Sequence, residues 1–142
     1  MMSIKPITED FAVAPQMEAG DVAAAAGLGY TTIINNRPDG EAPGQPNAAE
    51  IEALAQQHGL AFVNIPVTAA TMTPEAVQST ATTLRNAPGP VLAYCRSGMR
   101  STTMWALAQA GQMPVDEILR RALQAGCDLS GLEAHLHAKG DI

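Results

Sequence analysis

The sequence predicts an α/β protein with a central, mainly parallel sheet of four to five strands and helices on both faces. Two observations support this fold class. Short segments rich in β-branched and apolar residues alternate along the chain with longer segments of helical periodicity. Glycine and proline separate these segments, and there is no internal repeat or domain linker. We therefore expect residues 1–142 to form a single domain that binds ligands at the carboxyl ends of its strands.

The first half of the chain is expected to supply three strands and two helices. In order, these are a strand at 7–14, a helix at 18–26, a strand at 30–34, a helix from 47 to 58 and a strand at 61–65. Asn47 followed three residues later by Glu50 is typical of a helix start. The segment 35–46 contains three prolines and two glycines, and this composition predicts a loop.

The second half is expected to supply one strand and four helices. These are a helix that begins at Thr73-Pro74, a strand at 91–94, a helix from about 102 to 111, and helices at 114–125 and 131–138. The helical periodicity of the first of these helices predicts a buried stripe of Val77, Thr80, Ala81 and Leu84.

The composition restricts the partners and the location of the protein. With 46% hydrophobic and 15% charged residues, the chain can bury one sizeable core. A formal net charge of −6 argues against a nucleic-acid partner, and no apolar run is long enough to span a membrane. The N-terminus lacks the apolar core of a secretory signal, so we expect a cytoplasmic protein with Cys95 and Cys127 as free thiols.

The loop after the strand at 91–94 is the most informative segment. It reads Cys95-Arg96-Ser97-Gly98-Met99-Arg100-Ser101, and a helical pattern follows. A strand–loop–helix turn aims backbone N–H groups and the positive end of a helix at one point, which suits an anion. A cysteine at that point is biased toward thiolate, the nucleophilic form. An inert core thiol is the alternative, but two flanking arginines argue against it.

The polar residues of this loop have functional and structural interpretations. Arg100 is predicted to clamp an oxyanion through two parallel hydrogen bonds, with Cys95 as the nucleophile. Arg96 could steer anions or form a surface ion pair. Gly98 would let the backbone curl its N–H groups inward. Ser101 could hydrogen-bond the anion, as could Ser97 and the Met99 backbone, but capping of the helix explains Ser101 equally well.

The loop resembles the active loops of the rhodanese sulfurtransferases and of the cysteine-dependent phosphatases. Segments 33–41 and 94–105 are more closely similar to the phosphatase-like domain family of the beta-lactamase-hydrolase-like proteins, which is also labelled a sulfurtransferase family. The resemblance extends from about Ile7 to about Leu136. It implies the fold of the tyrosine and dual-specificity phosphatases, with the cysteine loop between a strand and a helix.

Two departures from the phosphatase pattern favour sulfur chemistry. Tyrosine phosphatases place five residues between Cys and Arg, whereas four separate Cys95 from Arg100, which resembles the rhodanese arrangement. Dual-specificity phosphatases also keep an acid soon after an Ile-Pro-hydrophobic stretch, to protonate the leaving group. In this chain 65–67 is such a stretch, and 68–71 contains no carboxyl group. In addition, Tyr94 stands where phosphatases usually have histidine.

The loop after the strand at 30–34 supplies the accessory candidates. Asp39 and Glu41 are the nearby carboxyl groups that could replace the missing acid, although Asp39 before Gly40 is more typical of a turn. Arg37 could bind an anion or hold its own loop through a salt bridge. Because both loops follow strand ends, they could face the same crevice.

We interpret the protein as a thiolate-dependent enzyme, for which three functions remain open. The first is rhodanese-type transfer of sulfane sulfur through a Cys95 persulfide, with a partner enzyme of sulfur metabolism as a further possibility. The second is hydrolysis of protein or small-molecule phosphates through a Cys95 thiophosphate. The third is a non-catalytic redox-sensing or anion-sensing module. The substrate of either enzyme would be a small anion that carries sulfur or phosphate.

No cofactor and no metal are expected. His58, His135 and His137 share no metal-ligand spacing with a cysteine. Cys127 could resolve an oxidised or persulfidated Cys95, but a buried thiol between two helices is the favoured interpretation.

Overall fold

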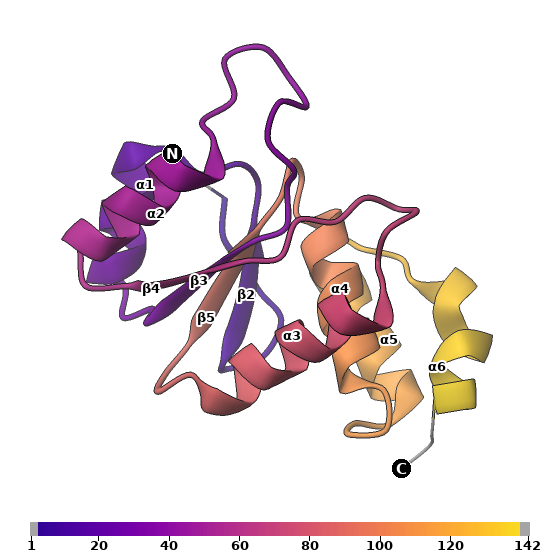
Figure 1. Ribbon diagram of the computed structural model, residues 1–142. Coiled ribbons are helices and arrows are strands. Elements are labelled where there is room, and N and C mark those ends of the chain that lie inside the picture. The colour runs from indigo at the N-terminus through magenta and orange to yellow at the C-terminus, as the bar shows by residue number, and fades with distance from the viewer. Residues whose placement is uncertain (1–2, 140–142) are drawn as a thin grey trace.

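The computed structural model describes residues 3–139 and contains one five-stranded sheet (Figure 1). The strands are β1 (Lys5–Pro6), β2 (Phe11–Ala14), β3 (Thr32–Asn35), β4 (Ala61–Asn64) and β5 (Val91–Tyr94). Their order across the sheet is β1-β2-β5-β3-β4, and every pair except β1–β2 is parallel. The predicted mainly parallel sheet is therefore confirmed.

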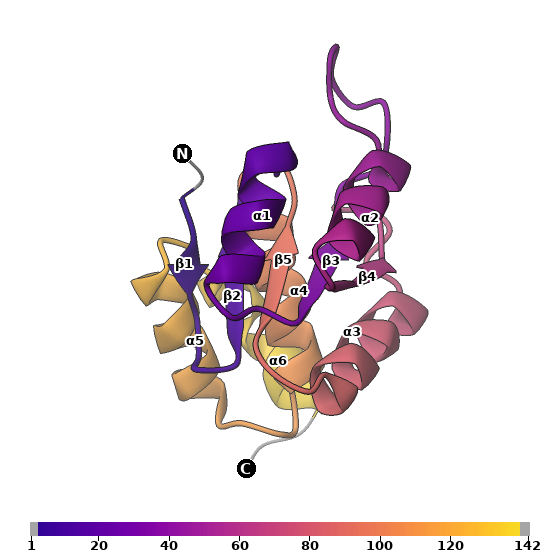
Figure 2. The ribbon, with the colours of Figure 1, turned by 90° about the vertical axis from the view of Figure 1, so that its left-hand side faces the viewer.

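Helices cover both faces of the sheet. The helices of the described residues are α1 (Ala19–Gly27), α2 (Ala48–Gln57), α3 (Pro74–Asn86), α4 (Met99–Gln109), α5 (Val115–Gln124) and α6 (Glu133–Lys139), with a short 3-10 turn at Ser130–Leu132. α1 and α2 lie on one face, and α3 to α6 lie on the other (Figures 1 and 2). Among residues 3–139, no helix has both the length and the apolar character needed to cross a membrane.

The alternation of side chains along the strands divides the core into two layers. Ile33 and Leu92 pack in the layer with α1 and α2, whereas Ile34 and Ala93 pack in the layer with α4 and α5. Trp105 of α4 is 1% exposed and belongs to the second layer. Burial of a large apolar side chain stabilises a fold by about 1.5–3 kcal/mol, so both layers hold the sheet in place. Both faces of the parallel sheet are thereby covered.

Two helix starts follow from local capping, as predicted. The Asn47 side chain accepts a hydrogen bond from the Glu50 N–H at 2.9 Å, and α2 begins at the next residue. The Thr73 hydroxyl accepts a hydrogen bond from the Ala76 N–H at 3.2 Å, and α3 begins at Pro74. These contacts satisfy N–H groups that the first turn of a helix leaves unpaired.

Two expected elements differ from the structure. The strand expected at 7–14 is extended only in its second half, because residues 7–10 form the turn between β1 and β2. In that turn the Ile7 N–H donates to the Phe11 carbonyl, and the Asp10 N–H donates to the Thr8 hydroxyl. α4 begins at Met99 instead of at about 102, so the last residues of the expected loop form the first helical turn.

The stripe predicted to be buried on α3 is only partly covered. Thr80 is 2% exposed, whereas Val77, Ala81 and Leu84 remain partly exposed. Val77 and Ala81 line a groove between α3, α4 and α6.

Candidate active site

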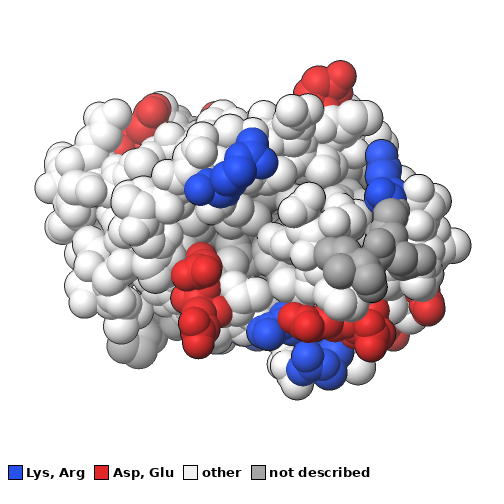
Figure 3. Space-filling model, turned by 90° about the horizontal axis from the view of Figure 1, so that it is seen from below, with Lys and Arg blue, Asp and Glu red and all other residues white. Residues whose placement is uncertain are grey.

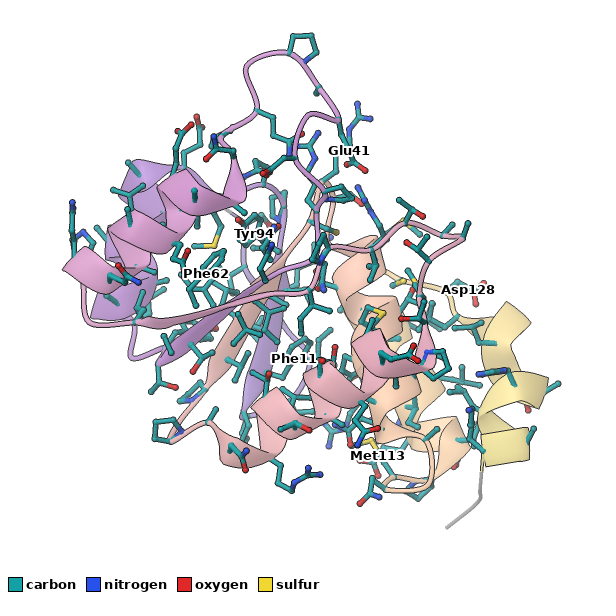
Figure 4. The ribbon with its side chains drawn as sticks, viewed as in Figure 1. Phe11, Glu41, Phe62, Tyr94, Met113 and Asp128 are labelled. Carbon is teal, nitrogen blue, oxygen red and sulfur yellow. The ribbon has the colours of Figure 1, made fainter. Side chains whose placement is uncertain are left out.

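The two polar loops of the sequence leave the sheet side by side. β3 and β5 are parallel neighbours, with Asn35 opposite Tyr94 at their carboxyl ends. The Asn36 N–H donates to the Tyr94 carbonyl at 2.8 Å and joins the two loops where they begin. Figure 4 shows Glu41 and Tyr94 toward the same end of the sheet. The expectation that both loops meet at one place is confirmed, because Glu41 hydrogen-bonds Arg100.

Cys95 follows β5 directly and is 1% exposed. Its Sγ accepts a hydrogen bond from the Gly98 N–H at 3.0 Å. Gly98 is the N-cap of α4 and has a φ of +96°, a conformation that other residues rarely adopt. A side chain at this position would also lie 3.5 Å from Val13 and 3.7 Å from the Ala14 carbonyl oxygen. The glycine therefore allows one amide to turn onto the sulfur.

Other backbone N–H groups of the loop remain available. Within residues 3–139, the amides of Arg96, Ser97, Arg100 and Ser101 have no hydrogen-bond acceptor. Two of them belong to the first turn of α4, where a helix leaves its N–H groups unpaired. The helix dipole adds positive potential at the same point. This arrangement can hold an anion next to the Cys95 sulfur.

The Arg100 guanidinium is fixed along one edge. Its Nη1 donates to Glu41 Oε2 at 2.9 Å and to the Val67 carbonyl at 3.0 Å, and its Nη2 donates to Glu41 Oε1 at 2.9 Å. These three bonds use both N–H groups of Nη1 and one of Nη2. The Nε–H and the second Nη2–H form a parallel pair that Glu41 and Val67 do not use, and a hydrogen bond with the Cys95 side chain is among the causes, after Glu41, that raise the pKa of Arg100. Such a pair matches two oxygens of an oxyanion.

Glu41 is a fixed carboxylate and not an acid. Its Oε1 also accepts a hydrogen bond from Arg37 Nε at 3.1 Å, so one carboxylate contacts two guanidinium groups. Hydrogen bonds from Arg100 and then Arg37, with the charges of both, lower the pKa of Glu41 to about 2. The carboxyl group is ionised at neutral pH and has no proton to give. Both ion pairs therefore argue against Glu41 as the missing acid.

Arg37 supports its own loop in this structure. It is 5% exposed, and its Nη1 donates to Gln16 Oε1 at 3.1 Å. Its backbone N–H donates to Asn35 Oδ1 at 2.8 Å. Of the two interpretations of Arg37, the structure shows the salt bridge, with Glu41. Sequence reasoning missed Gln16, because no motif marks this residue in the segment after β2.

Asp39 anchors the same loop to α2. Its Oδ1 accepts a hydrogen bond from the N–H of Ala48, the first residue of α2, at 2.8 Å. Gly40, which follows, has a φ of +78°, so the turn interpretation of Asp39 agrees with the backbone. Burial raises the pKa of Tyr94, and the charge of Asp39 adds to this effect. The residue before Cys95 is therefore a neutral phenol that packs in the layer with α1 and α2.

Of the remaining loop side chains, Ser97 accepts a hydrogen bond from the N–H of Met99, the first residue of α4, at 3.4 Å. Ser101 is the third residue of α4, and the N-cap of this helix makes no side-chain hydrogen bond, so the capping interpretation of Ser101 is wrong. Its hydroxyl is buried without a hydrogen-bond partner among the described residues. Met99 is 56% exposed. Arg96 is exposed and has no ion pair within residues 3–139, so its charge is free to attract anions.

The remaining residues that could have taken part in chemistry contribute to the fold instead. Thr68 and Thr71 hydrogen-bond each other in the segment where dual-specificity phosphatases keep an acid. Cys127 is 3% exposed and lies in the core, as favoured from the sequence. Burial raises the pKa of the Cys127 thiol, and the charges of Asp128 and Cys95 add to the effect. Nowhere in residues 3–139 do three or more His, Cys, Asp or Glu side chains gather in a way that could hold a metal ion.

The fold is that of the cysteine-dependent phosphatases. The structure is similar to that of a candidate phosphatase from Neisseria meningitidis, with a TM-score of 0.84, 38% identity and coverage of 98% of this chain and 99% of that chain. TpbA of Pseudomonas aeruginosa in complex with pTyr matches with a TM-score of 0.63, 17% identity and coverage of 94% and 90%. Tk-PTP matches with a TM-score of 0.69, 16% identity and coverage of 96% and 95%. The last two likenesses show the fold alone.

Residues 3–112 match the phosphatase-like domain of beta-lactamase hydrolase-like protein, and the chain belongs to this family. The beta-lactamase hydrolase-like protein of Xylella fastidiosa is 35% identical over 130 residues, which is 90% of this chain and 30% of that protein. The protein of the same name from Agrobacterium fabrum is 35% identical over 104 residues, which is 73% of this chain and 24% of that protein. The chain therefore spans less than a third of the length of these relatives.

Proposed function

We propose that this protein transfers sulfane sulfur through a persulfide on Cys95, without help from a general acid. The observation that carries the proposal is the state of the two carboxyl groups on the loop beside Cys95. Glu41 is ionised between two guanidinium groups, and Asp39 is bound to the N-terminus of α2. A site without an available acid favours leaving groups that depart as stable anions.

The first step needs no proton transfer. The Cys95 thiolate attacks the outer sulfur of thiosulfate, the S–S bond of the donor breaks, and sulfite leaves with the bonding electron pair. The parallel Nε–H and Nη2–H of Arg100 are suited to two oxygens of the departing sulfite, on which charge increases. The unpaired amides at the start of α4 are suited to the persulfide anion that remains.

The second step returns the thiolate. A thiolate acceptor or cyanide attacks the terminal sulfur of the persulfide, and the Cys95 sulfur leaves with the electron pair of the S–S bond. The loop length supports a small transferred group. Four residues separate Cys95 from Arg100, one fewer than in tyrosine phosphatases, so the cradle is tighter and better suited to one sulfur atom.

Mass spectrometry tests the proposal. We expect the wild-type protein to gain the mass of one sulfur atom on Cys95 after treatment with thiosulfate or glutathione persulfide. Added cyanide should remove this sulfur as thiocyanate. The Cys127→Ser variant is the matched control and should still be modified, whereas Cys95→Ser should not. Absence of added sulfur on Cys95, together with absence of sulfur transfer by the wild type, would contradict the proposal.

Phosphate-ester hydrolysis is the second candidate, and the Arg100 geometry favours it as well. The same Nε–H and Nη2–H pair fits two oxygens of a phosphoryl group, and the family and the Neisseria meningitidis structure carry phosphatase names. Cys95 would attack phosphorus, the ester oxygen would leave, and water would hydrolyse the thiophosphate. Without an acid, this reaction is restricted to esters with a stable anionic leaving group, such as aryl phosphates. Vanadate-sensitive turnover of an aryl phosphate that is faster than sulfur transfer and lost in Cys95→Ser would favour this function over the first.

A further inference from the structure

A cavity lies at the opposite end of α4 from Cys95. It has a volume of about 530 Å³ and opens between α3, the C-terminal half of α4, and α6. A smaller cavity of about 280 Å³ shares Ala81, Arg85 and Ala108 with it, so the two form one groove along α3. α4 has 11 residues and rises about 1.5 Å per residue, so its length separates this groove from the cysteine loop. Figure 4 shows Met113, just beyond α4, at the end of the molecule opposite Glu41.

The floor of the groove is apolar. Its lining includes Met72, Val77, Ala81, Leu107, Ala108 and Ala110. Val77 and Ala81 belong to the helical stripe that the sequence predicts to be buried, yet both are partly exposed. Among the described residues, part of this apolar stripe therefore stays exposed, although its helical spacing is typical of a stripe that packs against another element.

The rim of the groove is cationic. Arg85, Lys139 and His135 line it, whereas no Asp or Glu of residues 3–139 does. Neither Arg85 nor Lys139 forms an ion pair within residues 3–139, and the guanidinium of Arg85 donates a hydrogen bond to the Thr82 hydroxyl at 3.4 Å. The chain has 14 acidic and 8 basic residues, so a rim on which the described residues place cations and no carboxylate runs against the average charge of the molecule.

Figure 3 views the lower end of the molecule. It shows a hollowed surface of mostly uncharged residues with separate Lys or Arg side chains above it, and Asp and Glu side chains lower on the same face. An apolar floor beside unpaired cations is complementary to a ligand with an apolar chain and one negative head group. A neutral ligand would leave the cations without a partner, and a small inorganic anion would leave the floor uncovered.

We infer that this groove binds an amphipathic carboxylate, with an unbranched acyl chain on the apolar floor and the carboxylate at Arg85. The volume lies in the usual range of small-molecule sites, about 300–1,000 Å³. The acyl chain covers the exposed part of the α3 stripe and is removed from water. The carboxylate accepts hydrogen bonds from the Arg85 guanidinium, which has no acidic partner among the described residues. This site is independent of the reaction proposed for Cys95.

Calorimetric titration of the wild-type protein with octanoate tests the inference. We expect saturable binding of one molecule per chain. Octanol has the chain without the charge, and acetate has the charge without the chain, so each should bind at least about tenfold more weakly. Methyl NMR signals of Leu107 and Ala108 should shift during the titration, whereas signals of the Cys95 loop should not.

Three variants locate the site. Ala108→Leu fills the floor and Arg85→Gln removes a cation, so each should weaken octanoate binding at least about tenfold. Arg120→Gln removes the same charge from an exposed position outside the groove and should leave binding unchanged. Circular dichroism confirms that each variant is folded, and the octanol and acetate comparisons use the wild type alone.

Several results would overturn the inference. One is that the wild type shows no saturable binding of octanoate. Another is that Ala108→Leu and Arg85→Gln bind octanoate as tightly as the wild type does. A third is that the wild type binds acetate as tightly as octanoate. Loss of binding in Arg100→Lys would place the ligand at the cysteine loop instead. A concentration-dependent dimer that Ala108→Leu disrupts would assign the groove to a second copy of the chain.

Discussion

The two ends of helix α4 present positive charge in opposite ways. At the N-terminal end, Arg100 and Arg37 share the carboxylate of Glu41, and their positions are fixed by hydrogen bonds of 2.9–3.1 Å. At the C-terminal end, Arg85 and Lys139 border an apolar groove without an ion-pair partner within residues 3–139. An arginine in an ion pair is held in place and has few N–H groups left to donate. An unpaired arginine keeps its charge and its N–H groups available to a ligand.

Preorganisation explains why one end suits chemistry and the other suits binding. The Arg100 edge that faces away from Glu41 offers its donors without first losing side-chain freedom, and such fixed donors stabilise charge that develops in a reaction. Arg85 would lose rotamer freedom when it binds, because within residues 3–139 its guanidinium is held by a long hydrogen bond to Thr82 and by no ion pair. If this contrast is correct, equivalent substitutions at the two ends should have unequal effects.

Arg100→Lys is expected to have the largest effect. Lysine offers a point charge and reproduces neither the contact with both Glu41 oxygens nor the parallel Nε–H and Nη2–H pair. We expect kcat/KM for sulfur transfer from thiosulfate to fall about 100- to 1,000-fold, the range seen when one oxyanion donor is removed. Arg96→Lys, at an exposed position of the same loop, is the matched control and should change kcat/KM by less than about threefold. Equal losses of kcat/KM in Arg100→Lys and Arg96→Lys would contradict the prediction that the fixed guanidinium of Arg100 is needed for the reaction.

Glu41→Gln should have a smaller effect on the same reaction. The amide keeps the shape of the carboxylate but cannot accept hydrogen bonds from two guanidinium groups through both of its ends. Hydrogen bonds to charged groups contribute about 1.5–3 kcal/mol, so we expect kcat/KM to fall about 10- to 100-fold. Most of the loss should be in kcat, because Glu41 positions the Arg100 donors that stabilise the charge developing on the departing sulfite. Glu52→Gln, exposed on α2, should behave like the wild type.

The Glu41 pair also predicts a pH dependence of stability. The pKa of Glu41 is lowered from 4.5 to about 2 in the folded protein. A lowered pKa gives stability that is fully present above the unfolded value and is lost as the pH falls through the folded value. The difference in free energy of unfolding between the wild type and Glu41→Gln should therefore be constant near neutral pH and shrink between about 4.5 and 2. Urea titrations across this range measure it, and a difference that vanishes already near pH 6 would contradict the pairing.

The smallest effect is expected from a cation at the groove. Arg85→Gln removes no ion pair, so the free energy of unfolding should change by less than about 0.5 kcal/mol and the transfer rate should not change. Arg37→Gln is the matched substitution at the other end. Arg37 is 5% exposed and paired with Glu41, so its loss should destabilise the fold by about 1.5–3 kcal/mol. Urea unfolding compares the two variants, and similar losses of stability would mean that pairing does not distinguish the two ends.

The parts of the structure that depend on local signals are predictable from the sequence. Short β-branched segments separated by glycine and proline predict the sheet, and the caps at Asn47 and Thr73 predict two helix starts. The anion-binding character of the turn after Tyr94 follows from residue types within one loop. These features depend on neighbours a few residues away, which the sequence displays directly.

The contacts that define the site could not be predicted in the same way. Glu41 and Arg100 are 59 residues apart, and Val67 and Arg100 are 33 residues apart, so their contacts depend on how β3, β4 and β5 align. The sequence identified Glu41 only as a candidate acid, because a carboxyl group in a loop does not reveal its partners. The early start of α4 was missed because a left-handed Gly98, and not a Ser or Thr side chain, occupies its N-cap.

The claim that the Cys95 site works without a general acid is tested most directly by a leaving-group series. Rates of sulfur transfer and of hydrolysis of aryl phosphates with increasingly basic phenols are measured on the same wild-type preparation. The account predicts that sulfur transfer exceeds hydrolysis of every ester and that any hydrolysis falls steeply as the phenol becomes more basic, because nothing protonates the departing oxygen. Hydrolysis that is faster than sulfur transfer and independent of phenol basicity would require an acid at the site and would contradict the account.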